Sequence, residues 1–382
     1  MNGNKNETGK NGRAFLFTAI ALACFIVIFD ILWIILPKKD FSESENRMLA
    51  SAPEITGDSL SEGGFGKGFE SFIADRVPLR DTLVSLRTAE KRLLGAIDNG
   101  GVYFGTDGYL FLKPAEQNKE SLARNLNAMD LFAWDHNSAS HYAAIIPNSC
   151  YVLSQKLPEY AEVPDQKAQL AEIAENLNDV KFIDVTGTLL AHKDEYIYYR
   201  TDHHWTTLGA YYTFCKVAES MGLDISEVSY SSYDVSASFE GTLASKSGAH
   251  GVYDVISVCM PEGVMCRVDY VDAGKEPSGT VYDKSALETK DKYALFLGGN
   301  YPLVKITTSA ESGRRLLLFK DSYANCFVQF LLPHFEEIII VDPRYYYEDS
   351  SPLISRYGIT DVLYLYNLDT FNTDNSLADA LH

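Results

Sequence analysis

The longest apolar stretch of the chain lies close to its N-terminus. Residues 14–36, from Ala14 to Leu36, read AFLFTAIALACFIVIFDILWIIL, and Asp30 is their only charged residue. A helix of this length would be roughly 34 Å long, enough to cross a bilayer. The stretch is also longer than the apolar region of a cleaved signal peptide. We therefore predict a transmembrane anchor at 14–36, preceded by a short tail at residues 1–13.

The residues after the anchor change character twice. Residues 37–65 contain the acidic run FSESEN, a proline and several glycines, which is typical of a tether. Leucines then recur at helical spacing after Pro78, and VYFGTDGYLFL alternates about Asp107-Gly108, which predicts a β-hairpin. Lysines and arginines flank the anchor about equally, so its orientation is inferred from the short tail. We expect the N-terminus inside the cell and a large extracytoplasmic domain at 66–382.

From residue 142 onward, short β-rich runs alternate with helical stretches. Helices are expected after Asp165 and after Ser322, and apolar strands separated by helices predict a mostly parallel sheet covered on both faces. The region from about 225 to 290 breaks this alternation and is interpreted as a β-rich insertion. The expected strands are 142–146, 181–185, 293–297, 315–319, 337–341 and 361–366.

The composition excludes one class of partner. The chain has 33 basic and 52 acidic residues, giving a formal net charge of −19 at pH 7 with histidine neutral. A surface of this sign repels phosphates, so we expect no nucleic acid as partner. The cysteines beyond Cys24 are odd in number and cannot form a complete disulfide framework. A turn at 261–264 would place Cys259 opposite Cys266 in a hairpin, at a separation that a disulfide can bridge.

A candidate nucleophile follows one of the expected strands. The strand at 315–319 runs into Lys320-Asp321-Ser322, and a helical stretch comes next. Since ligands bind at the carboxyl ends of such strands, Ser322 would lie on a strand-to-helix turn beside them. Its backbone N–H at a helix N-terminus would help to bind an oxyanion. The alternative is that Ser322 merely caps the helix, as serines commonly do.

A candidate oxyanion donor follows another expected strand. Gly298, Gly299 and Asn300 come directly after the apolar run at 293–297. Glycines allow a close approach of the backbone to a ligand, and the Asn300 amide could donate to a developing oxyanion. An ordinary Gly-Gly-Asn turn is the alternative. We include Asn325, on the helix after Ser322, among the candidate substrate-binding residues.

Two adjacent histidines stand between an aspartate and a tryptophan. On an extended segment, Asp202 and His204 would share a face and His203 would point the other way. A carboxylate beside a histidine fixes its tautomer and stabilises the imidazolium, as in a Ser-His-Asp arrangement. One alternative is a solvated loop, and another is a divalent-metal site that includes His192. Neighbouring residues on a strand cannot all face one ion, which argues against the metal.

These motifs resemble those of SGNH/GDSL hydrolases. HWTTLG at 204–209 is similar to their block with the catalytic histidine, and Lys320-Asp321-Ser322 is similar to their Gly-Asp-Ser block. Asn300 would stand for their oxyanion asparagine. The serine block follows the histidine block here, an order similar to that of the alginate O-acetyltransferase type. Two departures are Lys320 in place of the usual glycine and the spacing of two residues between Asp202 and His204, where three are usual.

A narrower resemblance is to the DHHW family of bacterial membrane-anchored proteins, from about residue 40 to the C-terminus. It rests on six motifs: ENR at 45–47, DRVPLRD at 75–81, GTDGYLF at 105–111, DHHW at 202–205, GGNYP at 298–302 and KDSYAN at 320–325. The resemblance implies an SGNH-hydrolase-like, flavodoxin-like α/β fold. It implies Ser322, His204 and Asp202 as catalytic residues, with His203, Trp205 and Asp321 in supporting positions.

The implied function is a membrane-anchored serine esterase or O-acetyltransferase. Its substrate would be an acyl group such as acetyl of a cell-surface or exported polysaccharide, and its expected partners are an acyl donor and a membrane-bound acyltransferase. No cofactor and no metal are expected. Two alternatives are a catalytically silent scaffold of a polysaccharide modification or export assembly, and a metal-dependent hydrolase built on Asp202, His203 and His204.

Overall fold

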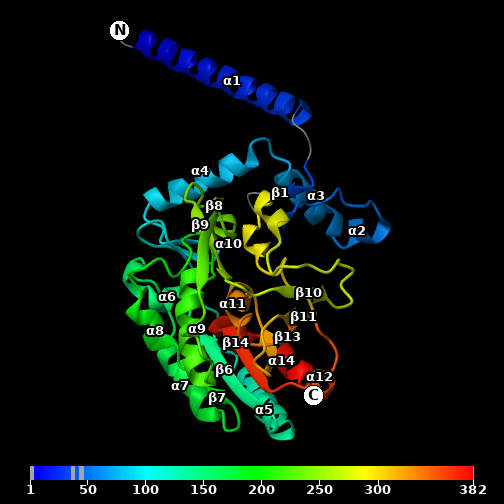
Figure 1. Ribbon diagram of the computed structural model, residues 1–382. Coiled ribbons are helices and arrows are strands. Elements are labelled where there is room, and N and C mark those ends of the chain that lie inside the picture. The colour runs from blue at the N-terminus through cyan, green and yellow to red at the C-terminus, as the bar shows by residue number, and fades with distance from the viewer. Residues whose placement is uncertain (1–3, 36–38, 43–46, 382) are drawn as a thin grey trace. The chain divides into compact units, whose positions relative to one another are not determined.

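The computed structural model describes residues 4–35, 39–42 and 47–381 (Figure 1). The chain forms two compact units, Met1–Glu90 and Lys91–His382. The first unit contains α1 (Asn4–Ile35), β1 (Phe41–Ser42), β2 (Arg47–Met48), α2 (Gly57–Ser61), α3 (Gly64–Asp75) and most of α4 (Arg80–Leu93).

Helix α1 carries the apolar stretch. Phe15–Ile35 is long and apolar enough to cross a membrane, and none of it is buried against the rest of the chain. An N-terminal apolar helix is thus confirmed, as a candidate membrane span or signal sequence, while the predicted end at Leu36 lies outside the described residues. The predicted boundaries of tail, anchor, tether and domain stay predictions. Within the predicted tether, Thr56 caps α2 by accepting a hydrogen bond from the Ser59 N–H.

The predicted hairpin at Asp107-Gly108 is present. Strands β4 (Val102–Phe104) and β5 (Leu110–Leu112) pair antiparallel, and β3 (Asp98–Asn99) pairs with β4. Asp107 and Gly108 have φ angles of 56° and 79°. A tight turn of this hand needs positive φ, which aspartate tolerates and glycine adopts freely.

The second unit is built on a seven-stranded, mostly parallel sheet. Its order is β10-β11-β13-β12-β14-β6-β7, and the five strands from β13 to β7 are parallel neighbours. If β12, β13, β14, β6 and β7 are numbered 1 to 5, the order of these strands in the sheet is 2-1-3-4-5, as in a flavodoxin-like fold. The topological switch point, where the strand order reverses, then lies beside β12. The strands are β6 (Ser140–Ile146), β7 (Lys181–Phe182), β10 (Cys266–Tyr270), β11 (Leu303–Thr308), β12 (Arg315–Lys320), β13 (Glu337–Val341) and β14 (Asp361–Asn367).

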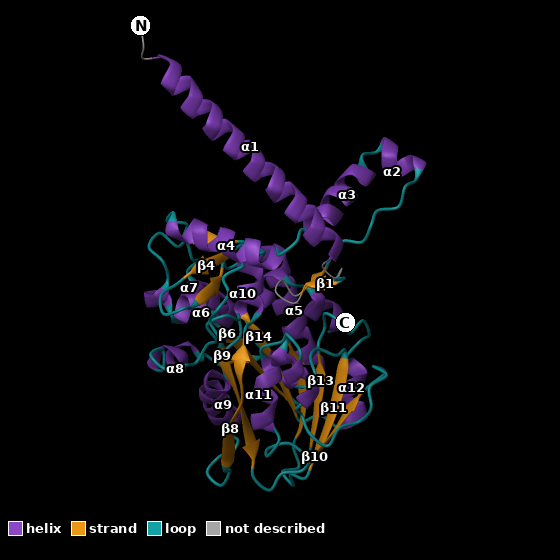
Figure 2. Ribbon diagram, turned by 90° about the horizontal axis from the view of Figure 1, so that it is seen from above, coloured by secondary structure: helices purple, strands orange, loops and turns teal. Residues whose placement is uncertain are grey.

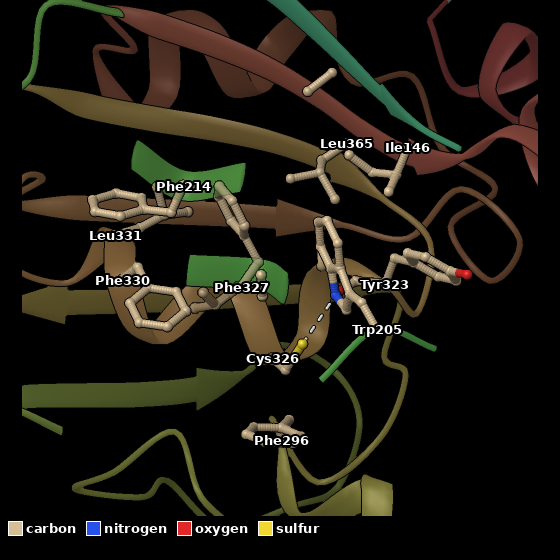
Figure 3. Packing of buried hydrophobic residues seen from close by; sticks show 14 of the residues in the cluster. Ile146, Trp205, Phe214, Phe296, Tyr323, Cys326, Phe327, Phe330, Leu331 and Leu365 are labelled. Carbon is tan, nitrogen blue, oxygen red and sulfur yellow. Dashed lines mark hydrogen bonds between the residues drawn. The ribbon is translucent and has the colours of Figure 1, made fainter. Parts of the chain in front are cut away.

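Helices cover both faces of this sheet, as predicted. Alternate residues of β12 enter different cores: Leu316 and Leu318 belong to one, and Leu317 and Phe319 to the other. The first core contains α9 and α11 side chains (Figure 3), and the second contains side chains of α5, α7, α12, α13 and α14. The helices are α5 (Lys119–Asp135), α6 (Ser149–Val152), α7 (Gln166–Asn176), α8 (Thr186–Ala191), α9 (Thr207–Met221), α11 (Ala324–Leu331), α12 (Ser351–Tyr357), α13 (Leu368–Thr373) and α14 (Ser376–Ala380).

The insertion is β-rich, but its predicted hairpin is wrong. Strand β9 (Asp254–Pro261) pairs with β8 (Tyr230–Phe239), whereas β10 pairs with β11 at the edge of the main sheet (Figure 2). Cys259 therefore lies opposite Ser232, and Cys266 lies opposite Thr308. Both cysteines are free thiols. The remaining elements here are α10 (Thr242–Ser247) and the 3₁₀ turn η2 (Lys284–Glu288); a further 3₁₀ turn, η1 (Ser154–Lys156), follows α6.

One expected strand is also wrong. Residues 293–297 do not pair as a strand of the sheet, since Lys292–Leu295 forms the 3₁₀ turn η3. The sheet strand of this region is β11, which begins at Leu303, a few residues further on. Tyr293, Leu295, Phe296 and Leu297 are nevertheless buried. A short run of core residues in a turn has the same composition as a buried strand, which explains the error.

Candidate active site

Ser322 lies on the turn between β12 and α11, at the carboxyl end of the central strand. Its Oγ is 2.8 Å from Nε2 of His204. The N-cap position of α11 is Tyr323, without a side-chain cap, so the Ser322 hydroxyl is not used as a helix cap. The nucleophile candidate and the base candidate, which are 118 residues apart in the sequence, are thus in hydrogen-bond contact.

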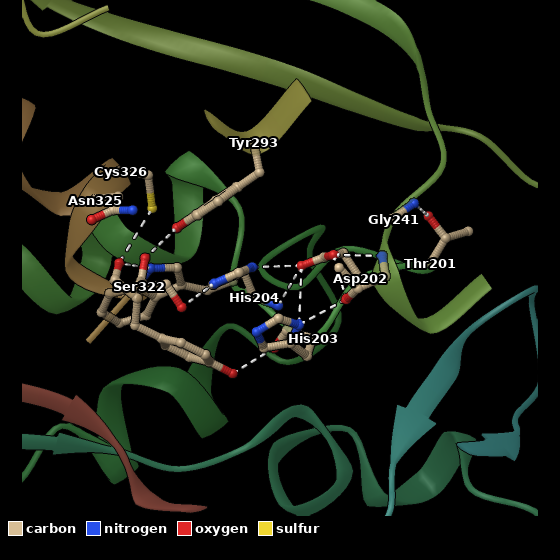
Figure 4. Close-up of polar contacts among 12 residues, drawn as sticks. Thr201, Asp202, His203, His204, Gly241, Tyr293, Ser322, Asn325 and Cys326 are labelled. Carbon is tan, nitrogen blue, oxygen red and sulfur yellow. Dashed lines mark hydrogen bonds and ion pairs between the residues drawn. The ribbon is translucent and has the colours of Figure 1, made fainter. Parts of the chain in front are cut away.

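Asp202 binds the other side of the His204 ring (Figure 4). His204 Nδ1 lies 2.6 Å from Asp202 Oδ1, and the His204 backbone N–H donates to the same oxygen at 3.0 Å. A side chain that accepts from the N–H two residues on forms an Asx-turn. The expected extended segment is therefore wrong, because residues 201–204 form a bend. The turn brings Asp202 and His204 together nonetheless.

Asp202 is buried and fully hydrogen-bonded. Its Oδ2 accepts from the backbone N–H of Thr242 at 2.8 Å and from the Thr242 hydroxyl at 2.9 Å. Burial by itself would raise the pKa of Asp202, but His203, His204 and the bonds from Thr242 outweigh it and hold this pKa far below its ordinary value. Asp202 is therefore a carboxylate at neutral pH. Gly241 permits the close approach, because a Cβ there would lie 2.3 Å from Asp202 Cβ.

His203 lies beside His204 but faces a different partner. The two imidazole centroids are 3.9 Å apart, and His203 Nδ1 lies 2.9 Å from the Thr242 hydroxyl oxygen. Because that hydroxyl donates to Asp202, it accepts from His203, which places the His203 proton on Nδ1. Burial and the neighbouring His204 lower the pKa of His203 to about 4. His203 is thus a neutral ring, and within the described residues it has no hydrogen bond to Ser322.

Tyr293 is a site residue that the sequence reasoning missed. Its ring stacks on His204 with centroids 3.9 Å apart and planes 12° apart, and its hydroxyl donates to the Ser322 carbonyl at 3.1 Å. Burial raises the pKa of Tyr293 well above its ordinary value, so the hydroxyl keeps its proton. The sequence assigned Tyr293 to a strand, and no signal there connects it with His204.

Trp205 and Asp321 brace the two loops of the site. The buried Trp205 donates from Nε1 to the Tyr323 carbonyl at 2.9 Å, and Tyr323 donates from its hydroxyl to the His203 carbonyl at 2.5 Å. Asp321 accepts from the backbone N–H groups of Tyr323 and Asn367, both at 2.9 Å. Burial raises the pKa of Asp321. These residues hold the His204 loop against the Ser322 turn.

The candidate oxyanion residues lie beside the same turn. Asn300 Oδ1 accepts from Lys320 Nζ at 2.8 Å and from Asn325 Nδ2 at 3.1 Å. Gly299 has a φ of 106°, which favours glycine. Among the described residues, no side-chain hydrogen bond joins Asn300 or Asn325 to Ser322. The Ser322 backbone N–H and the Asn300 Nδ2 group have no hydrogen-bond partner among the described residues.

Residues 137–341, more than half of the chain, match the sequence model of the family described as DHHW protein. The chain belongs to the DHHW family. Both DHHW at 202–205 and the KDSYAN motif at 320–325 lie within the matched region. No curated protein matches this DHHW protein. The resemblance drawn from the sequence motifs is thus confirmed.

Solved structures extend the comparison. A DHHW family protein from Eubacterium siraeum DSM 15702 is similar at 26% identity with a TM-score of 0.66, over 75% of this chain and 96% of that one. Bacillus cereus PatB1, solved with a sulfonyl adduct, is similar at 21% identity with a TM-score of 0.59, over 72% and 97%. A weaker likeness is to the O-acetyltransferase domain of Pseudomonas putida AlgJ, at 14% identity with a TM-score of 0.46, over 72% of this chain and 93% of that one. The PatB1 likeness shows a shared fold.

The metal alternative has a partial structural basis. Asp202, His203 and His204 offer ligand atoms within 4.8 Å of one another, so the expectation that these neighbours cannot face one ion is wrong for a bent chain. His192 is not part of this cluster; it stacks on Tyr212. Both nitrogens of His204 are already in contact with Asp202 and Ser322. Without breaking those contacts, the cluster supplies fewer protein ligands than a zinc site uses.

Proposed function

We propose that this DHHW protein is a serine-dependent acyl-transfer enzyme, an esterase or O-acetyltransferase. The observation that carries the proposal is the continuous series of contacts from Ser322 Oγ through His204 to Asp202, at 2.8 and 2.6 Å. A serine hydroxyl is a weak nucleophile until a positioned base removes its proton. An ionised Asp202 favours the His204 tautomer that carries its proton on Nδ1 and leaves Nε2 free to act as that base.

The reaction has two halves with the same proton path. In the first, Ser322 Oγ attacks an ester carbonyl carbon, and its proton passes to His204 Nε2. The tetrahedral intermediate collapses, the alcohol leaves with that proton, and the acyl group stays on Ser322. In the second, water or a sugar hydroxyl gives its proton to His204 and attacks the acyl-enzyme, which restores the Ser322 hydroxyl. The Ser322 N–H and the Asn300 amide would donate to the oxyanion in both halves.

The substrate class follows from the predicted location of the domain. We infer an acetyl ester on a cell-surface or exported polysaccharide, with Phe15–Ile35 as the membrane anchor and the large domain outside the cell. Water as acceptor makes the protein an esterase, and a sugar hydroxyl makes it a transferase. A transferase needs an acyl donor, and a membrane-bound acyltransferase partner could supply it at the membrane surface.

The test uses the full chain in detergent with two probes. A chromogenic acetyl ester reports turnover, and a sulfonyl fluoride, suggested by the adduct of PatB1, reports a reactive serine through mass spectrometry of the Ser322 peptide. Ser322→Ala and His204→Ala should each reduce turnover to near background, and combining them should add little. His192→Ala is the matched control, because this histidine is also paired with an acid, Glu195, outside the site.

Three outcomes separate the candidate functions. Ser322-dependent turnover with a labelled Ser322 supports the acyl-transfer enzyme. A wild-type protein that neither turns over acetyl esters nor reacts at Ser322 points to the silent scaffold. Turnover that chelators abolish and Zn²⁺ restores, with equal losses in His203→Ala and His204→Ala, points to a metal-dependent hydrolase on the Asp202 cluster.

A further inference from the structure

A buried lysine precedes the nucleophile candidate. Lys320 is the last residue of β12, and its side chain is only 1% exposed. Its Nζ lies 3.0 Å from Asp342 Oδ2 and 2.8 Å from Asn300 Oδ1. A buried ion pair adds little stability compared with well-packed apolar residues of the same volume. The acyl-transfer steps proposed above do not use this ammonium, so neither stability nor those steps explain why a lysine is buried beside the site.

The ammonium fixes which way the Asn300 amide points. A lysine ammonium can only donate, so the Asn300 atom that it contacts must be the carbonyl oxygen. The same oxygen accepts a second hydrogen bond from Asn325 Nδ2, at 3.1 Å. With Oδ1 held by two donors, a flip of the amide would place its NH₂ against both of them. Asn300 Nδ2 therefore faces away from Lys320.

The held amide stands beside the helix end that carries Ser322. Asn325 is in the first turn of α11, where its backbone N–H donates to the Ser322 carbonyl at 3.2 Å. Asn325 thus connects Asn300 to the turn of Ser322. Both remaining donors here, the Ser322 N–H and Asn300 Nδ2, have no partner within the residues that the structure describes. Unpaired donors at a helix N-terminus are suited to bind a developing negative charge.

We propose that Lys320 is a positioning residue, whose buried ammonium orients the Asn300 amide so that Nδ2 donates to the oxyanion formed at Ser322. This inference rests on the proposed acyl-transfer function. It also gives a reason for the lysine that replaces the usual glycine before Asp321-Ser322. Lys320 acts through Asn300 and does not contact the reacting atoms itself.

The chain offers a variant that should fold and a matched control. In Lys320→Met the buried volume is kept, and Asp342 remains paired with Arg344, which donates to both carboxylate oxygens at 2.8 and 2.7 Å. Lys305 on β11 pairs with Glu337 on β13 at 2.7 Å, away from Asn300. Lys305→Met therefore removes another ion-paired strand lysine, partly exposed, without a hydrogen bond to the amide, and should keep wild-type turnover.

The experiment is a double-mutant cycle in kcat on the acetyl ester. Lys320→Met should lower kcat about 10- to 100-fold with little change in KM, and Asn300→Ala about 10²- to 10³-fold. If Lys320 acts only through Asn300, adding Lys320→Met to Asn300→Ala should lower kcat by less than about 2-fold further. Asn300→Asp keeps the acceptor for Lys320 but loses the donor, so it should match Asn300→Ala in kcat while its thermal midpoint stays near that of the wild type.

Several results would overturn the inference. Losses that multiply in the double variant, an unchanged kcat in Lys320→Met, or a fully active Asn300→Asp each rule out positioning through the amide. In Lys320→Met the labelling of Ser322 by the sulfonyl fluoride should become slower to the same degree as kcat falls. An unchanged labelling rate in this variant would also contradict the positioning role of Lys320. Failure of the proposed function looks different: wild type and Ser322→Ala are then equally inert to both probes, and the positioning inference falls with it.

Discussion

The phenol ring of Tyr293 lies flat against the imidazole of His204, with centroids 3.9 Å apart and planes 12° apart. The Tyr293 hydroxyl donates to the Ser322 carbonyl at 3.1 Å. One buried side chain from η3 therefore contacts both the nucleophile candidate and its base. The aromatic face lies where positive charge develops when His204 takes the serine proton, and such a face stabilises a cation.

Separate substitutions at Tyr293 should distinguish its two contacts. Tyr293→Leu removes the aromatic face that lies against the imidazolium formed in the reaction, so we expect a loss of roughly tenfold in kcat. Tyr293→Phe keeps the stacking and loses the hydrogen bond from its hydroxyl to the Ser322 carbonyl, so it should retain most of the wild-type kcat. Equal losses of kcat in both variants would show that stacking is not the cause.

A glycine outside the Ser-His-Asp set controls where Asp202 lies. A Cβ at Gly241 would lie 2.3 Å from Asp202 Cβ and 2.6 Å from its Oδ2, so Gly241→Ala must displace the carboxylate. We expect a loss of kcat that approaches the roughly 10⁴-fold loss expected for Asp202→Asn. Gly187→Ala is the control, because a Cβ there meets nothing within 4 Å and a helical alanine stabilises α8. A fully active Gly241→Ala would contradict the role given to Asp202.

Most of the parallel strands could be predicted from short apolar runs rich in β-branched residues. EIIIV is such a run, typical of a strand covered on both faces, and β13 has the predicted bounds, 337–341. The position of Ser322 after β12 follows from the same logic, since polar residues between a buried strand and a helix must lie at the sheet edge. The spatial neighbours of Ser322 required motif resemblance, because His204 is 118 residues away in the sequence.

Most of the parts that could not be predicted depend on tertiary contacts. Tyr293 and its neighbours are as apolar as a strand, but they fill the core from a 3₁₀ turn. The segment between Cys259 and Cys266 has the sequence of a turn, yet the strands that contain these cysteines pair with other strands: β9 pairs with β8, and β10 pairs with β11. Asp202 and His204 were expected on an extended segment, whereas an Asx-turn brings them together. In the first two cases contacts distant in sequence selected one of two structures that the local pattern fitted, whereas the Asx-turn is a local contact between residues two apart.

His203 should make stability depend on pH in a defined window. Its folded-state pKa of about 4 lies below the ordinary value of 6.5 because of burial and His204, opposed by Asp202, Asp321 and Asp291. The unfolded chain therefore binds a proton between pH 6.5 and pH 4 that the folded chain does not, so this contribution to stability is complete above pH 6.5 and is lost as the pH falls.

A difference measurement isolates this contribution from the other titrating groups. From pH 7 to pH 5, the free energy of unfolding of the wild type should fall about 1 kcal/mol more than that of His203→Gln, allowing for partial exposure of the ring. Urea unfolding of both proteins at each pH provides the comparison. The depressed pKa of Asp202 acts at more acidic pH, below its ordinary value, and does not enter this window. Parallel curves for the two proteins would show that His203 is not held neutral.

The last prediction concerns the candidate anchor in α1. Phe15–Ile35 is an apolar helix, none of which is buried inside the described structure. If it crosses the membrane, the full chain should remain in the membrane pellet after alkaline carbonate extraction. Ile26→Lys with Ile28→Lys should weaken insertion, because each lysine near the centre of a span costs about 2.5–3.5 kcal/mol. Asp30→Leu, which removes the only charge of the span, should stay in the pellet.

Orientation needs a second readout on the same proteins. With the domain outside, protease added to intact cells should digest the region beyond residue 40 and leave a short fragment that contains α1. A fully protected domain in cells with an accessible surface would reverse the proposed topology and, with it, the polysaccharide substrate. A wild-type chain released as a soluble protein cut after α1 would show that this helix is a signal sequence, since the same apolar composition serves both purposes. Because Ser322, His204 and Asp202 all lie in the second unit, that result would leave their chemistry intact and change only where the protein meets its substrate.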